Sequence, residues 1–281
     1  MMCSAVENSI KENLEGESNK VEGSEIDYSD IYQYAYMGSQ DNIERMFETL
    51  SAIAEEECWS FDEDNPNSIL KYYIFHTFSQ CMKQDKVLES ADGQLTCFNT
   101  GLLTKNGNDI IALFSKNRIP DHQQWALKGF FDRCYREIMD YFPNIPEIAT
   151  YDDDSQDTGF HLEDSLVLNL DHILDDNWDR IHDLIPFEKS VTKTLLVGVV
   201  EEAKAKIKRN KRLVIPQYFK DEIMYLIPIV FPIDDKQSVT MALAVEKTET
   251  GQYRANTILT REMAYERARL LMKPDSSWLV D

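Results

Sequence analysis

The order in which helical and strand-like periodicity follow one another is the feature that most constrains this fold. Apolar residues recur at helical spacing from Asp41 to Ala54 and from Ser68 to Met82. Strand-like runs then follow one another, and helical stripes frame them. A doubly wound sheet needs strands that alternate with helices. The order therefore predicts an α+β protein, with a largely antiparallel sheet flanked by helices in a single globular domain over residues 26–281.

Local signals place the individual elements. Asn106-Gly107 between the apolar runs 95–103 and 109–114 predicts a β-hairpin. Val191 to Arg209 has an apolar stripe on residues 191, 195, 199, 203 and 207, widened by Leu196 and Val200, which predicts a long helix. Trp125 to Tyr141 has helical spacing, although its first part also suits a strand. The remaining predicted elements are strands at 165–170, 213–218, 223–231, 239–245 and 252–259, and a helix over 261–272 capped by Thr260.

The N-terminal segment lacks the features of a targeting signal. Residues 1–25 are polar and acidic, which predicts a disordered leader. The longest apolar run, Ile223 to Phe231, contains Pro228 and is much shorter than the ~20 residues that cross a bilayer. Five scattered cysteines without a CxxC pair predict reduced thiols and no metal site. We therefore expect a cytoplasmic protein without a membrane partner.

Charge is distributed unevenly along the chain. The net charge is −21, but residues 186–281 contain 16 Lys and Arg against 13 Asp and Glu, so the first 185 residues carry −24. Such a total disfavours indiscriminate polyanion binding. Six cations nevertheless fall within residues 204–212, and Lys204 and Lys208 lie off the apolar face of their helix. This segment is a candidate phosphate site; alternatively, the cations stabilise the helix C-terminus through its dipole.

Two further constellations near the C-terminus suit a nucleotide. Strand alternation sends Arg254 and Asn256 to one face of the strand 252–259, opposite Thr257. In the following helix, Tyr265 and Arg269 lie on one line, where a guanidinium could bind phosphate and a phenol ring could stack on a base. The alternative is a surface ion-pair network with neighbouring glutamates.

Two other groups are candidates for chemistry. The run Asn99-Thr100-Gly101 could bind an anion, or could form a structural turn. His172, with carboxylates three and four residues on and Arg180 nearby, could act as a general base; alternatively, these residues form a polar helix. No phosphate-loop, dinucleotide-binding, nucleophile-elbow or HExxH motif is present.

Several segments resemble a bacterial family of domains of unknown function. They are YYIFHTF at 72–78, FNTGL at 98–102, RN at 209–210 with IPQYF at 215–219, LIPI at 226–229, and YRANTILTREMAYERARLLMKPDSSW at 253–278. Members of this family sometimes accompany cold-shock or LOTUS-type modules, which points toward RNA. The resemblance implies a polar site comprising Asn99, Thr100, Gly101, His172, Asn177, Arg180, Arg209, Asn210, Gln217, Asn256, Thr257, Tyr265 and Arg269. The chain departs from the family pattern at Lys211 and Arg267, which weakens any stacking role at these positions.

These observations favour a domain that binds RNA or a nucleotide through the segment 204–212, including Lys208, with Arg254, Asn256, Tyr265 and Arg269 completing the site. One alternative is an RNA- or nucleotide-processing enzyme that uses His172 and Arg180. Another is a protein-interaction module without a small ligand. The leading hypothesis expects these polar side chains to gather in one cleft. No motif assigns a cofactor or an oligomeric state.

Overall fold

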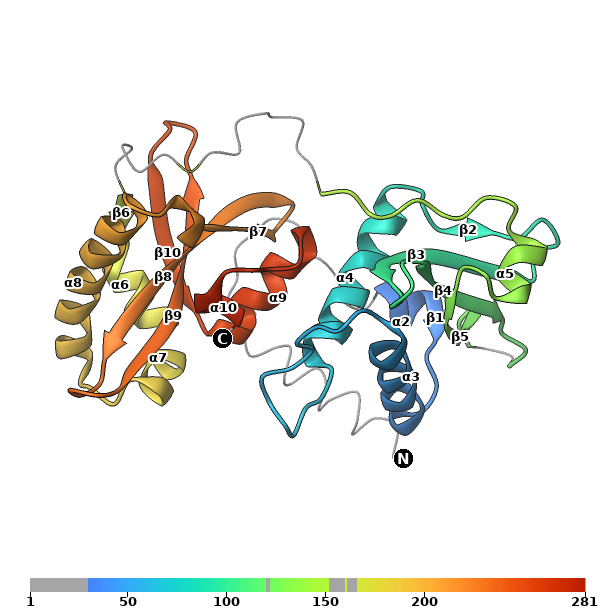
Figure 1. The fold of residues 1–281 in the computed structure, drawn as a ribbon, viewed down its shortest axis with the longest axis horizontal. Helices are drawn as coiled ribbons and strands as arrows, with labels where there is room; N and C mark the ends of the chain where they lie inside the picture. The colour runs from blue at the N-terminus through green and yellow to red at the C-terminus, as the bar shows by residue number, and fades with distance from the viewer. Residues whose placement is uncertain (1–29, 120–121, 152–159, 161–165, 281) are drawn as a thin grey trace.

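The computed structural model describes residues 30–119, 122–151, 160 and 166–280. The predicted acidic leader lies outside these residues. Within them the chain forms two five-stranded sheets with helices on their faces (Figure 1), which confirms the predicted α+β class. The sequence predicts one sheet, whereas the described residues form two.

The first sheet has the strand order β1-β5-β4-β3-β2. Its members are β1 (Ala35–Tyr36), β2 (Leu88–Glu89), β3 (Leu95–Leu103), β4 (Asp109–Lys116) and β5 (Trp125–Asp132). The β1–β5 pair is parallel, and the β5–β4, β4–β3 and β3–β2 pairs are antiparallel. The helices α2 (Asp30–Tyr34), α3 (Gln40–Ile53) and α4 (Ser68–Lys83) share a core with one face, and α5 (Arg136–Tyr141) covers part of the other.

The second sheet has the order β6-β10-β9-β8-β7. Its strands are β6 (Leu166–Leu168), β7 (Ile215–Phe219), β8 (Glu222–Pro232), β9 (Ser238–Lys247) and β10 (Tyr253–Leu259). The β6–β10 pair is parallel and the others are antiparallel. One face packs on α6 (Leu170–Asp176), α7 (Trp178–Leu184) and α8 (Lys189–Ile207). The other face receives α9 (Arg261–Leu271) and α10 (Ser277–Val280).

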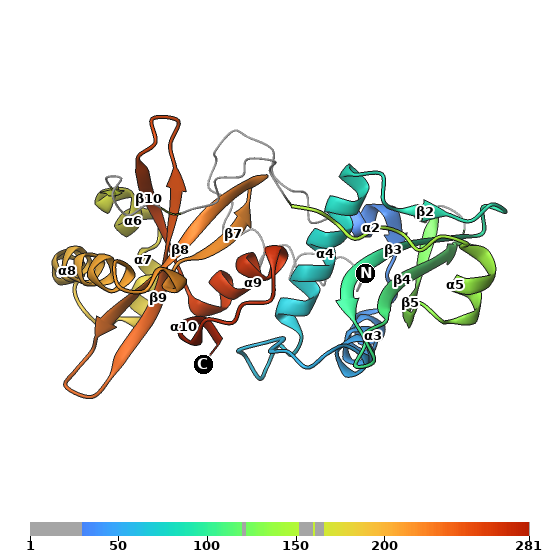
Figure 2. The same ribbon diagram turned by 45° about the horizontal axis from the view of Figure 1, so that its top comes forward.

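Helix α9 lies between the two halves of the molecule. It contacts β7 on one side and α4 on the other, and both views show it between the second sheet and α4 (Figures 1 and 2). Buried residues from α4, α9 and both sheets form one continuous apolar cluster. Among the described residues, no helix combines the length and the apolar character needed to span a bilayer.

Most predicted elements are confirmed, and the differences have local causes. The segment that suited either a helix or a strand is strand β5 followed by the short helix α5. Most of the predicted stripe of α8 is buried, including Leu196 and Val199, but at the start of the helix Thr192 is buried and Val191 is 46% exposed. Thr260 caps α9 by accepting a hydrogen bond from the amide of Met263, as predicted. The hairpin at Gly107 also forms as predicted.

The segment Asn99-Thr100-Gly101 forms a bulge in β3. The β3–β4 register shifts between Asn99 and Leu103, and Gly101 has a φ of +73°. A Cβ atom at Gly101 would lie 2.7 Å from the hydroxyl oxygen of Tyr73, which belongs to α4. Glycine is therefore required both by the backbone conformation and by the close approach of α4.

We predict that Gly101→Ala destabilises the protein more than Gly107→Ala. Both glycines have positive φ, but a Cβ at Gly107 meets nothing within 4 Å. Gly107→Ala should cost about 1 kcal/mol through backbone strain, and Gly101→Ala about 1–3 kcal/mol more because Tyr73 must move. Urea unfolding monitored by fluorescence measures both, and equal losses would show that Tyr73 does not constrain this turn.

Candidate functional site

A cluster of exposed cations, which we call the basic patch, lies where α8 ends. It consists of Lys208, Arg209, Lys211 and Arg212, the last two in the 3-10 helix η1 (Lys211–Leu213). Asn210 shapes the turn between them by accepting a hydrogen bond from the amide of Arg212 at 3.2 Å. A guanidinium nitrogen of Arg209 donates to the carbonyl oxygen of Ala205 at 2.7 Å. Within the described part of the chain, none of the four cations has a carboxylate partner.

The two cations upstream of the basic patch differ from it. Lys204 pairs with Glu201 at 2.6 Å and Lys206 with Glu202 at 2.7 Å. Both contacts lie on the surface of α8 one turn back along the helix. The six-cation segment of the sequence therefore divides into two neutralised lysines and four cations without counter-charges.

An aromatic ring that sequence reasoning missed lies beside the basic patch. The indole Nε1 of Trp278, in α10, donates to the carbonyl oxygen of Leu213 at 2.9 Å, one residue after Arg212. The side chain is partly exposed. The contact joins segments 65 residues apart, so no local periodicity could have indicated it.

A buried ion pair lies at the junction of α9 with the loop that precedes α4. The guanidinium of Arg269 bonds to the carboxylate of Glu57, with side-chain exposures of 11% and 4%. The hydroxyl of Tyr265 donates to the same carboxylate at 3.1 Å. Arg269 also lies 4.5 Å from the ring centroid of Tyr73 and 5.5 Å from that of Trp59. The predicted alignment of Tyr265 and Arg269 is present, but their partner is this distant glutamate.

Burial and the charge of Glu57 shift the pKa values of Tyr265 and Arg269. Burial raises the pKa of the Tyr265 phenol, and the negative charge of Glu57 raises it further. Burial alone would lower the pKa of the Arg269 guanidinium, but its hydrogen bond and charge interaction with Glu57 raise it. The cluster therefore holds a persistent ion pair and a neutral phenol, which is the arrangement of a structural contact.

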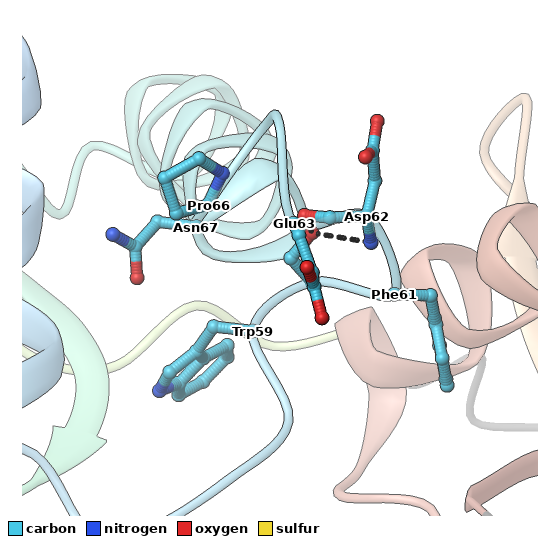
Figure 3. A pocket seen from close by; sticks show the side chains of 7 residues that line it. Trp59, Phe61, Asp62, Glu63, Pro66 and Asn67 are labelled. Carbon is cyan, nitrogen blue, oxygen red and sulfur yellow. Dashed lines mark hydrogen bonds between the residues drawn. The ribbon is translucent and has the colours of Figure 1, made fainter.

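A hollow open to solvent lies beside this ion pair. Its lining comes from the loop before α4: Trp59, Ser60, Phe61, Asp62, Glu63, Pro66 and Asn67. Figure 3 shows the ring of Phe61 turned toward α9 and that of Trp59 on the opposite side of the loop. The arginines of α9 already cover these rings, since Arg261 lies 4.9 Å from the centroid of Phe61 and Arg269 covers Trp59. The hollow thus offers no free aromatic cage for a cation.

The candidate anion loop is occupied by internal hydrogen bonds. Asn99, 3% exposed, donates to the carbonyl oxygen of Pro146 and accepts from the amide of Gly101. Thr100 is fully buried and donates to the carbonyl oxygen of Ile110 at 2.7 Å. These bonds hold the bulge that brings Gly101 against Tyr73. Asn99, Thr100 and Gly101 therefore form a structural turn, which is the alternative to an anion site that the sequence left open.

The candidate catalytic residues lie on the opposite side of the second sheet from α9. His172 is exposed on α6 and its Nδ1 lies 2.9 Å from a carboxylate oxygen of Asp176. Asn177 is buried between α6 and α7, where its amide donates to the carbonyl oxygen of Ile173. Arg180 donates to the side-chain oxygen of Asn177 at 3.1 Å and to the carbonyl oxygen of Ile258 at 2.7 Å. Asn177 and Arg180 therefore fasten α6 and α7 to β10.

Polar residues of β10 surround one carboxylate of β9. Arg254 and Asn256 both donate to Glu246, at 2.5 and 3.0 Å. Thr257 differs from its predicted orientation, because a bulge after Ala255 places Thr257 opposite Ala244 and so on the face that carries Arg254. The regular alternation assumed for this strand is interrupted there.

Two further polar side chains, those of Gln217 and His76, are buried near α9. Gln217 in β7 is 0% exposed, and neither of its amide atoms has a hydrogen-bond partner among the described residues. His76 in α4 is 5% exposed, with its ring 4.2 Å from that of Tyr72. Burial, together with the charges of Arg267 and Lys83, lowers the pKa of His76 to about 3.

The predicted site residues therefore do not share one cleft. Gly101 and Arg269 meet at Tyr73, while Asn177 and Arg180 meet β10 on the far face of the second sheet. The basic patch lies apart from both, at the end of α8. Long hydrogen-bonding side chains from distant segments serve the junctions between elements, which spacing in the sequence cannot distinguish from a ligand site. In the described ranges, no group of three or more His, Cys, Asp or Glu is arranged to hold a metal ion.

We predict that Arg269→Met lowers the free energy of unfolding by about 3–5 kcal/mol, because it leaves the Glu57 carboxylate buried without a counter-charge. The double variant Glu57→Gln/Arg269→Met should recover part of this loss. Arg136→Met, which removes an exposed pair with Asp140, is the control and should change stability far less. Urea unfolding of the four proteins measures these differences, and a double variant no more stable than Arg269→Met would contradict the assignment.

Acid should destabilise the protein through His76. The unfolded histidine binds a proton near pH 6.5, whereas the buried one does so only near its lowered pKa of about 3. The unfolded state therefore binds more protons between these values, so stability falls as pH decreases from about 6.5. His76→Gln should reduce this slope by up to about 1.4 kcal/mol per pH unit. Urea unfolding at a series of pH values measures the slope, and an unchanged slope in His76→Gln would refute the prediction.

Comparison with known proteins identifies a family without assigning an activity. A family model described as a domain of unknown function (DUF3825) matches residues 50–278. No curated protein and no solved structure matches the chain. The match covers all the segments on which the family resemblance was based. The chain thus belongs to the DUF3825 family of domains of unknown function.

Proposed function

We propose that this protein binds RNA or a nucleotide through the basic patch. The supporting observation is that Lys208, Arg209, Lys211 and Arg212 are exposed, adjacent, and without carboxylate partners among the described residues. Elsewhere on α8 the lysines are neutralised, as by Asp175, Asp171, Glu201 and Glu202. A cation left unpaired in so acidic a chain is available to an external phosphate.

Stabilisation of the helix dipole accounts for only part of the basic patch. Arg209 bonds to a carbonyl oxygen of the last helical turn and so serves this purpose directly. The side chains of Lys208, Lys211 and Arg212 make no such contact with any residue that the structure describes. Stabilising the C-terminus of α8 therefore accounts for Arg209 and leaves three cations of the basic patch unexplained.

The predicted contributions of Arg254, Tyr265 and Arg269 are not part of this proposal. Arg254 is bound to Glu246, and Tyr265 and Arg269 are buried against Glu57. Releasing them to a ligand would leave these glutamates without their partners. A site confined to a few phosphates implies weak binding that salt suppresses strongly.

The proposal is tested by comparing two double variants of α8 and η1 that remove the same charge. Lys208→Gln/Lys211→Gln should weaken binding of a labelled single-stranded RNA and lower the slope of log affinity against log salt by about 1.4, at ~0.7 per phosphate contact. Lys189→Gln/Lys193→Gln removes two lysines already paired with Asp175 and Asp171, and should change the slope little. Fluorescence anisotropy from ~50 to 300 mM salt measures both.

Two results would contradict this proposal. One is the absence of binding by the unaltered protein to RNA and to a panel of nucleotides at ~50 mM salt, where phosphate contacts are strongest. The other is an equal loss of slope in both double variants, because this would attribute binding to overall charge and not to the basic patch.

A further inference from the structure

Trp278 differs from the other tryptophans in the contacts of its ring. The sequence has four tryptophans. Trp59 lies under Arg269, Trp125 stacks on Tyr34, and Trp178 stacks on His182 beneath Lys189. Over the ranges that the structure describes, Trp278 has neither an aromatic nor a cationic partner for its ring.

The ring of Trp278 is held in place by its polar edge. Its indole nitrogen bonds to the carbonyl oxygen of Leu213, and the neighbouring Leu279 is fully buried in the main core. This satisfies the one polar atom of the indole, and the ring itself packs partly against the same core while the rest of it stays exposed. A fixed, partly exposed ring beside unpaired cations is the combination by which proteins bind single-stranded nucleic acid: cations contact the backbone and the ring stacks on a base.

The extent of the basic patch and the ring beside it suit a single strand. The four cations lie within five consecutive residues, so they reach only a short stretch of backbone. A ring that stacks on a base requires a base whose face is accessible, which a single strand offers and a duplex does not.

We propose that the ligand of the basic patch is a single-stranded nucleic acid and that Trp278 stacks on one of its bases. This inference rests on the proposed function and adds the strandedness of the ligand and the residue that selects it. It separates two roles: the cations supply salt-dependent attraction, and Trp278 supplies an attraction that requires a base.

Three labelled probes of equal length distinguish these roles: a single-stranded RNA, the same RNA in a duplex, and a single strand of abasic sugar-phosphate. The single-stranded RNA should bind about 5- to 100-fold more tightly than the abasic strand, as one stacked base provides. The duplex should bind more weakly than the single strand. All three affinities are measured by anisotropy at ~50 mM salt.

Three variants test the ring itself. Trp278→Leu removes the stacking surface and should weaken RNA binding about 5- to 100-fold while leaving the salt slope and the abasic-strand affinity unchanged. Trp278→Phe retains a ring but loses the hydrogen bond to Leu213, and should keep most of the affinity. Trp178→Leu is the matched control, because that ring is already covered by Lys189 and His182. Thermal unfolding establishes that each variant is folded.

The outcomes separate this inference from the proposed function. Equal binding of RNA and the abasic strand, duplex binding as tight as that of the single strand, or unchanged RNA binding by folded Trp278→Leu would overturn the inference and leave the basic patch as a polyanion site. If none of the probes binds, both proposals fail. If Trp278→Leu does not fold, the comparison of Trp278→Phe with the unaltered protein on RNA and abasic strand decides, and loss of the preference for bases in that variant counts against stacking.

Discussion

The contact of α9 with its surroundings is the interaction on which this structure depends. The helix presents small residues such as Ala264 and Ala268 to the core, and these are fully buried. Its Tyr265 is buried as well and its Arg269 largely so, and both meet Glu57 in the loop before α4. A buried ion pair of this kind contributes less through its own attraction than through the cost of separating it. It therefore specifies where α9 lies more than it adds to stability.

This role of α9 explains how much of the fold could be predicted. Local periodicity identified the helices and strands well, because helical spacing and hairpin turns are encoded by neighbouring residues. The division into two sheets could not be found in this way, since strand pairings between distant segments leave no local signal. The start of α8 differs from its prediction for the same reason: Thr192 is buried because tertiary packing selects the face, although Val191 is more apolar.

The candidate site was predictable only where exposure could be inferred. The cations at the end of α8 were identified because they exceed what a helix end needs, and the structure shows them exposed. Asn99, Asn177 and Arg180 had the residue types of a ligand site, but their hydrogen bonds are made within the chain. A polar side chain that joins two elements and one that binds a ligand are identical in sequence. Trp278 was missed for the opposite reason. Its contact with Leu213 joins segments 65 residues apart, so it depends on the tertiary fold and leaves no local signal.

The position of α9 late in the chain has a consequence during synthesis. The loop with Glu57 and helix α4 leave the ribosome some 200 residues before Arg269 does. Until then the apolar side of α4 that α9 covers, together with the adjoining face of β7 and β8, has no partner within the part already made. The nascent protein therefore exposes this apolar surface during much of its translation. Chaperones that bind apolar surface can bind there during this time. A chain that ends before Thr260 would lack α9 and would leave this surface exposed after synthesis.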